Sequence, residues 1–368
     1  MADWARVRAE FPALANWTYL NSATYGQLPK RGVQASLRHY EHRDELACSD
    51  FLSWFDDMDT IRVSAARLVN TAAADIAFVS NAATALSWLL VGMEWNEGDR
   101  IVTLENEFPN NLYHAATLAR RGVELVEAPW AGIRDVINDR TRAVLVSTVN
   151  YTTGFRPELK DFSQWLRSRG ILLYVDGTQS VGAMQFDVQD VQPDMLAVHG
   201  YKWLLSPNGA GFAYISPELR RVLPPTVIGW RSHTGWREVN QLHHGTPEFA
   251  DLAERYEGGM LNFPSLYAMG ASIEMMLELG PEQIEERVLE LARNCETMLR
   301  EAGAAVEHSG SPVLAARFAG ADVGALGARL KEERIIVSAR HGRLRVSVHF
   351  YNNEDDIQHL GSALRRLL

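Results

Sequence analysis

Six short apolar runs that alternate with helical patterns constrain the fold of this chain more than any other feature of its sequence. The runs occupy residues 76–80, 101–104, 143–147, 171–175, 195–198 and 211–215. Continuous apolar runs of this length, separated by helices, are typical of a mostly parallel β-sheet that is buried on both faces. In such a sheet the ligand binds at the carboxyl ends of the strands. We therefore predict an α/β fold with its functional site at that edge.

The last third of the chain has a different pattern. Residues 281–303 predict an amphipathic helix that begins at Pro281 and is closed by Gly303. A final helix begins at Asn353, and short strand candidates precede it at 313–318, 335–338 and 344–348. This pattern indicates a smaller α+β domain, and 368 residues exceed what one hydrophobic core usually serves. We expect a large domain over residues 17–255 and a small domain formed by residues 1–16 and 256–368.

Composition and charge argue against several classes of protein. The hydrophobic content is 46% and the formal net charge is −10, without a dense basic block, which argues against nucleic acid or an anionic membrane as a partner. No apolar run approaches the roughly 20 residues that span a bilayer, and the N-terminal segment lacks the apolar core of a signal peptide. Cys48 and Cys295 lie far apart without a CxxC motif, as is usual for reduced thiols. We expect a cytoplasmic protein.

Two classes of site lack support in the sequence. His39 with His42, and His243 with His244, are close pairs without an organised set of further metal ligands, so we expect no metal site. No GxGxxG motif follows the first strand and no Walker A motif is present, which argues against a nicotinamide or nucleoside triphosphate site.

One acid and one amine point to a specific chemistry. Asp176 ends the apolar run 171–175, and Lys202 follows the run 195–198 between two aromatic residues. A pyridoxal phosphate (PLP) site requires an amine to form a Schiff base and an acid to hold the proton of the pyridinium ring. Taken singly, an aspartate after a strand is usually a cap, and a lysine between aromatics usually lies at the surface. Their order and context favour the PLP site.

The segments Tyr174-Val-Asp-Gly-Thr-Gln-Ser-Val-Gly182 and His199-Gly-Tyr-Lys-Trp-Leu204 resemble those of the class V aminotransferase family of fold-type I PLP enzymes. This family includes cysteine desulfurases, kynureninase and isopenicillin N epimerase. Its Asp-Gly-x-Gln motif precedes the Schiff-base lysine by a few tens of residues, and Asp176 precedes Lys202 by 26 residues here. The similarity extends from about Tyr19 to the C-terminal helix. It implies fold-type I architecture, PLP as cofactor, and a homodimer with active sites at the interface.

The resemblance also implies how the phosphate of PLP would be bound. Ser80-Asn-Ala-Ala-Thr84 follows a predicted strand and opens a helix, whose N-terminal N–H groups and dipole favour an anion. Phosphate contact in the family is made at the positions of Ala83 and Thr84, with Thr178 and Tyr201 as further donors. An ordinary helix start is the alternative for this segment.

Other family positions imply contacts to the ring and to a partner subunit. Phe108 matches the aromatic residue or histidine that stacks on PLP, and Gln179 matches a glutamine near the phenolic oxygen of the ring. Asn150 is a further candidate for the same region. Gly259 matches the glycine of a Gly-Thr turn that reaches the phosphate of the neighbouring subunit, and here Met260 replaces the threonine.

Arg345 and Tyr25 are the residues implied to bind the substrate. Arg345 lies in Arg343-Leu-Arg-Val-Ser-Val-His-Phe-Tyr-Asn352, which resembles the family segment Arg-x-Ser-x-x-x-Tyr-Asn. Its guanidinium would bind the α-carboxylate of an amino acid through two parallel hydrogen bonds. The candidates for the pocket wall, or equally for the core of a dimer interface, are Trp230, His233 and Trp236.

One departure from the family pattern affects the expected activity. Desulfurases carry a nucleophilic cysteine on a flexible loop before the Arg-x-Ser segment, whereas Ser338 here leads almost directly into Leu344 without a cysteine. Cys295 has the position of a core residue in a helix. We therefore expect a PLP-dependent lyase or transferase that is not a persulfide-forming cysteine desulfurase.

The resulting prediction is an enzyme that acts on an α-amino acid through a Schiff base and a Cα carbanion. Lys202 would be the general base at Cα, and Asp176 would keep the ring nitrogen protonated. We favour cleavage of a C–S or C–C bond in the side chain of a cysteine-like substrate, because Tyr201 resembles the tyrosine of kynureninase. Transamination, epimerisation and decarboxylation are alternatives within the family. A non-catalytic sensor or scaffold with this fold is the alternative from another class.

Overall fold

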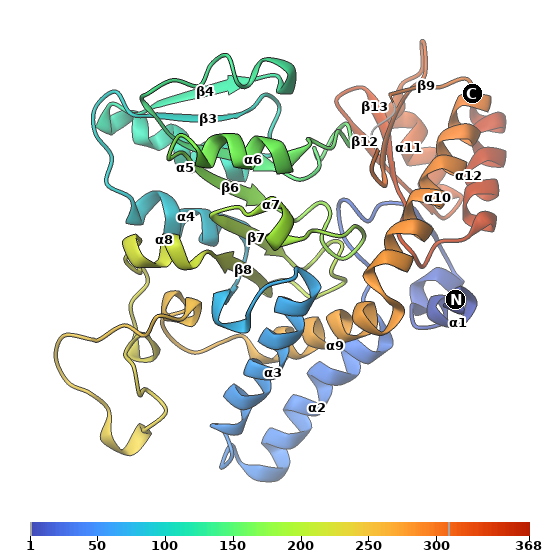
Figure 1. Cartoon of the computed structure of the whole chain (residues 1–368). Coiled ribbons are helices and arrows are strands. Elements are labelled where there is room, and N and C mark those ends of the chain that lie inside the picture. Colours follow the sequence, from blue (N-terminus) through green and yellow to red (C-terminus); the bar gives the residue numbers. More distant parts are fainter. Residues whose placement is uncertain (1, 308–309) are drawn as a thin grey trace.

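A seven-stranded β-sheet forms the centre of the larger part of the molecule in the computed structural model, which describes residues 2–307 and 310–368 (Figure 1). The strand order is β2-β8-β7-β6-β5-β3-β4. The strands are β2 (Ile76–Val79), β3 (Arg100–Leu104), β4 (Glu124–Ala128), β5 (Thr141–Ser147), β6 (Leu172–Asp176), β7 (Met195–His199) and β8 (Gly211–Ile215). Only β8 within this sheet runs antiparallel to its neighbours. The predicted α/β class with a mostly parallel sheet is confirmed.

Helices cover both faces of this sheet. Helices α4 (Ala82–Gly92) and α5 (Pro109–Thr117) pack on one face, and α3 (Ser53–Leu68), α6 (Leu159–Arg167) and α9 (Phe263–Leu279) on the other. Successive side chains of β5 divide between the two faces, since Ala143 and Leu145 join one apolar cluster while Val144 and Val146 join the other. All four are fully buried, which explains why this strand reads as a continuous apolar run.

The remaining helices of the larger part lie around its periphery. Helix α2 packs alongside α9, and it crosses the lower part of the view in Figure 1. These helices are α2 (Lys30–Leu46), α7 (Val188–Val191) and α8 (Pro217–Val222). Among the described residues, no helix is both long and apolar enough to cross a membrane.

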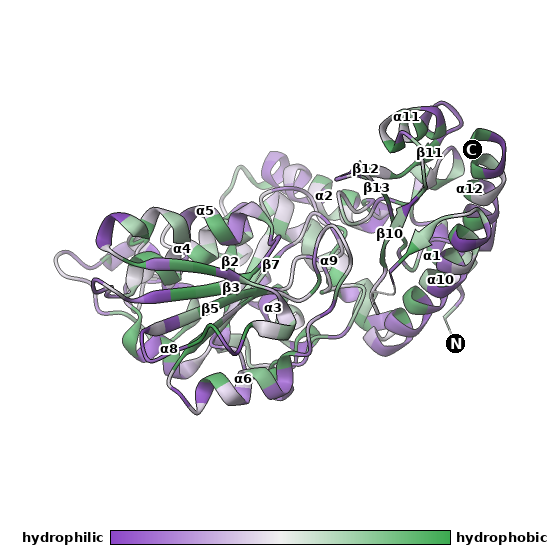
Figure 2. Ribbon diagram, turned by 90° about the horizontal axis from the view of Figure 1, so that it is seen from above, coloured by the Kyte–Doolittle hydropathy of each residue, from purple (hydrophilic) through white to green (hydrophobic). Residues whose placement is uncertain are grey.

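A second, antiparallel sheet lies at the opposite end of the molecule, as the view from above shows (Figure 2). Its strands, in the order β12-β13-β10-β9, are β12 (Ser338–Arg340), β13 (Arg343–Ser347), β10 (Val313–Arg317) and β9 (Ala305–Val306). Leu344 of β13 packs in a separate apolar cluster with Leu291 and Leu360. The helices of this part are α10 (Pro281–Glu301), α11 (Val323–Glu332) and α12 (Glu354–Leu367). The predicted α+β character of the last third is confirmed.

The N-terminal segment lies against this smaller part (Figure 1). Helix α1 (Trp4–Arg8) ends in Arg8, whose guanidinium forms an ion pair with Asp356 of α12 at 2.8 Å. Strand β1 (Thr18–Tyr19) pairs in parallel with β11 (Ile335–Ile336). These contacts agree with a small domain that includes the first residues, although the boundaries at 16–17 and 255–256 stay a prediction.

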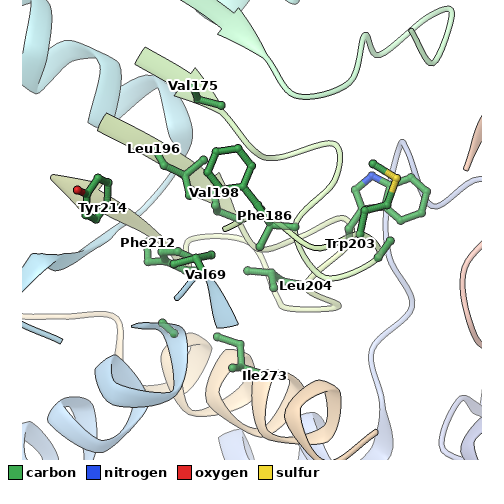
Figure 3. Packing of buried hydrophobic residues seen from close by; sticks show 14 of the residues in the cluster. Val69, Val175, Phe186, Leu196, Val198, Trp203, Leu204, Phe212, Tyr214 and Ile273 are labelled. Atoms are coloured by element: carbon green, nitrogen blue, oxygen red, sulfur yellow. The ribbon is translucent and has the colours of Figure 1, made fainter. Parts of the chain in front are cut away.

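The segment that carries Lys202 is anchored in the core below the sheet edge. Figure 3 shows Trp203 and Leu204 among the buried side chains of the cluster that also contains Leu196 and Val198 of β7. Trp203 is fully buried. A lysine preceding two such side chains has a fixed backbone position, so its amine has a defined place in the site.

Candidate active site

Asp176 and Lys202 line the same cavity. Asp176 is the last residue of β6, and its register partner on β7 is Ala197. The chain continues from β7 directly into the segment of Lys202, so adjacent parallel strands bring the acid and the amine to one edge of the sheet. Both side chains are buried. The lining residues are Ala82, Phe108, Asn110, Ser147, Tyr151, Asp176, Thr178, Gln179, His199, Tyr201 and Lys202.

Burial changes the proton affinities of both groups. It lowers the pKa of Lys202 to about 7, and the negative charge of Asp176 opposes this effect only in part. Burial also raises the pKa of Asp176, while hydrogen bonds from Thr178 and the charge of Lys202 lower it. The backbone N–H of Thr178 donates to Oδ1 of Asp176 at 2.9 Å. An amine with a pKa near neutrality is unprotonated in an appreciable fraction of molecules, as a nucleophile toward an aldehyde requires.

His199 is the last residue of β7, and one nitrogen of its ring lacks a hydrogen-bond partner among residues 2–307 and 310–368. Its Nε2 is buried and has no hydrogen-bond partner within the described part of the chain. Burial, followed by the charge of Lys202, lowers the pKa of His199 to about 4. Leaving such an atom unsatisfied costs about 1–3 kcal/mol. A ligand that forms a hydrogen bond to this nitrogen would remove that cost, so the cavity has a place for a polar group of a cofactor.

Further polar groups surround the same corner. Thr178 Oγ1 accepts a hydrogen bond from the backbone N–H of His199 at 3.1 Å, and the ring centroid of Tyr201 lies 4.3 Å from that of His199. Sequence reasoning identified Thr178 and Tyr201 but missed His199. Its position at the carboxyl end of a central strand was the available signal.

The N-terminus of α4 contributes another part of the cavity wall. Ala82 lines the cavity, and α4 packs against β7. The side chain of Asn81 caps the helix by accepting the backbone N–H of Thr84 at 2.9 Å. The first N–H groups of a helix lack partners within it. Asn81 already accepts a hydrogen bond from the backbone N–H of Thr84. The backbone N–H groups of Ala82 and Ala83 are therefore better suited to bind an anion.

Of the three residues predicted to lie near the ring of PLP, two line the cavity and one does not. The ring centroid of Phe108 lies 5.3 Å from Nζ of Lys202, and Gln179 lines the cavity as well. Asn150 lies elsewhere, in a neighbouring cleft. Its Oδ1 accepts the backbone N–H groups of Thr152 and Thr153, both at 3.0 Å, so its amide supports a turn.

Glu107 is a buried acid that sequence reasoning missed. Its Oε1 accepts the backbone N–H of Ser147 at 2.7 Å, and its Oε2 accepts the hydroxyl of Ser147 at 2.6 Å. The side-chain amide of Asn111 also donates to Oε2, at 3.2 Å. This network joins the segment of Phe108 to the end of β5, whose last residue is opposite Asp176. Glu107 therefore positions the aromatic wall of the cavity.

Arg345 is a buried guanidinium without a carboxylate. It is 1% exposed, and its Nη1 donates to the carbonyl oxygen of Tyr151 at 2.6 Å. Its Nη2 donates to Thr24 Oγ1 at 2.5 Å and to Asn21 Oδ1 at 3.3 Å. Across residues 2–307 and 310–368 it forms no ion pair, and its Nε lacks an acceptor. Burial, followed by the charge of Arg340, lowers its pKa to about 9. These properties suit the binding of a substrate carboxylate.

Six predicted residues are absent from the cavity lining, namely Tyr25, Ala83, Thr84, Asn150, Gly259 and Arg345. Tyr25 is half exposed, and its ring centroid lies 4.9 Å from that of Tyr201, which places it at the rim. Gly259 belongs to a different surface, where its carbonyl oxygen accepts Arg231 Nη1 at 3.1 Å. Because its predicted contact is with a second subunit, the structure of a single chain does not test that prediction.

The aromatic segment after β8 packs away from the cofactor cavity of its own chain. Trp230 and Trp236 lie edge-on to Phe55, with ring centroids at 6.1 and 4.8 Å. His233 stacks on His243 at 4.1 Å. None of the three lines the cofactor cavity, and the choice between a pocket wall and the core of a dimer interface stays a prediction.

Comparison with known proteins relates the whole chain to one family. The model of the aminotransferase class-V family matches residues 18–360. A probable cysteine desulfurase of Methanothermobacter thermautotrophicus is 25% identical over 98% of this chain and 97% of its own length. An uncharacterised aminotransferase of Bacillus subtilis, YcbU, is 23% identical over 96% of this chain and 95% of its own length.

Solved structures show the same fold over nearly the full length. The cystine C–S lyase C-DES, in complex with its reaction product cysteine persulfide, has a TM-score of 0.89 at 23% identity and covers 96% of this chain and 99% of its own. A cysteine desulfurase from Thermococcus onnurineus has a TM-score of 0.89 at 21% identity and covers 100% of this chain and 98% of its own. The predicted fold-type I architecture is confirmed.

The expectation that excluded a persulfide-forming cysteine desulfurase is wrong, because relatives along the whole chain carry that name. The exclusion depended on one missing cysteine near Ser338. In C-DES the persulfide is a reaction product derived from cystine. The fate of the sulfur therefore does not follow from a single position on one loop. Another structure of C-DES holds glycine covalently linked to PLP, in agreement with the predicted cofactor. The chain belongs to the class-V aminotransferase family.

Proposed function

We propose that this protein cleaves the carbon–sulfur bond of cysteine or of an S-substituted cysteine with the help of PLP. The observation that carries the proposal is the buried pair of Asp176 and Lys202 in one cavity. The guanidinium of Arg345 lies outside that lining, but it is close enough for its charge to lower the pKa of Lys202. The names of relatives as cysteine desulfurases, and the likeness to a cystine C–S lyase, support sulfur chemistry over other reactions of the family.

PLP would supply an electrophilic aldehyde and an electron-withdrawing ring that stabilises negative charge at Cα. Lys202 would hold the cofactor through its amine, and Asp176 would hold the proton on the ring nitrogen. The start of α4, with Thr178, His199 and Tyr201, would bind the phosphate. Phe108 would cover one face of the ring and exclude water from it. Each of these assignments agrees with the cavity that the residues line.

The substrate would be held by its carboxylate while a proton moves at Cα. The guanidinium of Arg345 would bind the α-carboxylate, which orients the Cα–H bond toward the amine of Lys202. Because burial lowers the pKa of Lys202 to about 7, this amine can accept a proton and return it near neutral pH. Loss of the sulfur substituent from Cβ would follow from the electron pair left at Cα.

A homodimer is the proposed assembly. Large apolar side chains are exposed on the segment after β8, which extends as a long loop at the lower left of Figure 1. Val222 is 75% exposed, and Ile228 and Met260 are each 59% exposed. Exposed apolar patches of this kind usually mark protein interfaces. Gly259 lies on this segment, so a second subunit would bring its turn to the partner's cofactor. Cytoplasmic location stays a prediction.

A substrate panel with purified protein and PLP tests the proposal. Cysteine, cystine and S-ethylcysteine should yield sulfide, cysteine persulfide and ethanethiol, respectively, each together with pyruvate and ammonia. Borohydride should fix the cofactor on Lys202, as peptide mass spectrometry would show, and Lys202→Ala should abolish both the adduct and turnover. Asp176→Asn should retain the adduct but lower kcat by about 100- to 1000-fold. Amino transfer to a keto acid without any release of sulfur would contradict the proposal.

A further inference from the structure

A second hollow adjoins the cofactor cavity at the same edge of the sheet. We call it the distal cleft, and its volume is about 430 Å³. Its walls include Pro129, Trp130, Tyr151, Phe155, His341 and Arg343. Tyr151 lines both hollows, so they meet at this residue. The carbonyl oxygen of Tyr151 also accepts Arg345 Nη1 at 2.6 Å, which links the distal cleft to the proposed anchor of the α-carboxylate.

The tip of the β12–β13 hairpin gives one side of the distal cleft a positive charge. Arg340 and Arg343 are register partners across the hairpin, and His341 lies in the turn between them. Neither arginine forms an ion pair with any of the residues for which the structure gives a position. The charge of Arg340 extends to the active site, since it contributes to the lowered pKa values of Lys202 and Arg345.

The opposite side of the distal cleft is less charged. Glu105 is the acidic residue of the lining, and its exposed position at the end of β3 lets solvent screen its charge. Trp130 and Phe155 provide apolar surface between this rim and the hairpin. A ligand with an apolar stem and an anionic end would therefore match the walls of the cleft, with the anion near the hairpin.

We propose that the distal cleft binds the leaving-group half of the substrate, and that this half carries a carboxylate which Arg343 and Arg340 recognise. The substrates are then S-substituted cysteines whose sulfur substituent ends in a carboxylate, including disulfides such as cystine. This assignment rests on the proposed C–S lyase function. The stem passes Tyr151, contacts Trp130 and Phe155, and places its carboxylate at the hairpin tip.

Two substrates of equal shape separate the charge of the leaving group from its size. They are S-(2-carboxyethyl)cysteine and its neutral amide, S-(2-carbamoylethyl)cysteine. We expect kcat/KM to favour the acid by about tenfold, because charge-assisted bonds to arginine are roughly twice as strong as neutral ones. The preference should lie in KM, and it should decrease with added salt because the hairpin is partly exposed.

Variants of the hairpin then test which residues produce the preference. Arg343→Gln and the double variant with Arg340→Gln should reduce the ratio of kcat/KM between acid and amide to near one. Arg121→Gln removes the same charge from an exposed position after α5 and should keep the wild-type ratio. Bound PLP, measured by its absorbance, should be equal in all variants, which shows that they are folded.

The outcomes distinguish this inference from the proposed function. Cleavage of both substrates with equal efficiency by the wild-type protein would overturn the distal site and leave the C–S lyase intact. An equal decrease of the acid-to-amide ratio in Arg121→Gln would also overturn the distal site, because long-range charge would then explain the preference for the acid. Absence of C–S cleavage with every sulfur amino acid, together with amino transfer, would overturn the proposed function itself.

Discussion

The indole N–H of Trp203 donates to Oε1 of Gln179 at 2.9 Å, and this bond joins the turn after Asp176 to the segment that carries Lys202. The side-chain amide of Gln179 in turn donates to the carbonyl oxygen of Ala23 at 3.1 Å. Three segments that are distant in the sequence thus meet at one glutamine. Gln179 holds the two proposed catalytic residues in register in addition to lining the cavity.

Trp203→Phe should destabilise the protein by about 1–3 kcal/mol, because it leaves the buried Oε1 of Gln179 without a donor. Urea unfolding of the apoprotein measures this change as a lower midpoint at constant slope. The partly exposed Trp165 provides a matched control, since Trp165→Phe removes the same indole N–H from a surface helix. Equal losses in the two variants would show that the bond to Gln179 contributes nothing specific.

The lowered pKa of Lys202 predicts a pH dependence of stability. The folded apoprotein binds this proton with a pKa of about 7, whereas the ordinary value is 10.5. Between these values the unfolded chain holds a proton that the folded chain lacks, so stability from this group rises with pH and the cost of burial is complete below about pH 7. The slope is at most about 1.4 kcal/mol per pH unit.

Lys202→Met removes that cost, so the variant should gain most over wild-type apoprotein at or below pH 7. The gain should shrink as the pH approaches 10.5, the ordinary value for lysine. Thermal unfolding across this range checks the trend, with Lys30→Met at an exposed position as control. A gain that is independent of pH would indicate better packing by methionine and no change in proton affinity.

Arg345→Lys should raise KM for cysteine-type substrates by about 10- to 100-fold, because an ammonium cannot reproduce the paired bonds of a buried guanidinium to a carboxylate. The matched probe is cysteamine, which lacks the carboxylate. Inhibition by cysteamine should be similar in both proteins. A variant that loses affinity for cysteamine to the same degree would contradict carboxylate binding by Arg345.

His199→Phe should weaken retention of the cofactor by about tenfold, since it removes the unpartnered Nε2 assigned to the phosphate. Fluorescence titration with pyridoxal phosphate measures the change, and pyridoxal without the phosphate serves as the comparison ligand. The affinity for pyridoxal should be nearly unaffected. His244→Phe, on an exposed loop, controls for the loss of a histidine. Equal weakening for both ligands would contradict phosphate binding by His199.

The central strands could be predicted because they are buried on both faces, as the fully buried β5 illustrates. Strand β4 was missed for the opposite reason. It lies at the edge of the sheet, and most of its residues are exposed or partly exposed. An edge strand needs no continuous apolar run, so hydrophobic periodicity does not reveal it. The strand predicted at 335–338 is divided between β11 and β12, which belong to different sheets.

Sequence reasoning singled out Asp176 at the end of one central strand, but it passed over His199 at the end of another and Glu107, whose partners are distant in the sequence. Asp176 could be identified because it ends an apolar run. The role of Glu107 depends on Ser147, which is 40 positions away, and no local sequence pattern predicts that contact. Asn150 was assigned to the cofactor region, but its side chain supports the turn at Thr152.

The apolar runs determined the fold class, and the acid and lysine that follow two of them pointed to the cofactor, since both depend on local pattern and residue type. The family came from the resemblance of the motifs around Asp176, Lys202 and Arg345. The tertiary structure alone decided which side chains share a cavity and how burial changes their proton affinities. The pKa of Lys202 illustrates the difference, because desolvation comes from atoms that surround the amine in space. The distal cleft likewise exists only where the hairpin of Arg343 lies beside the ends of β3, β4 and β5.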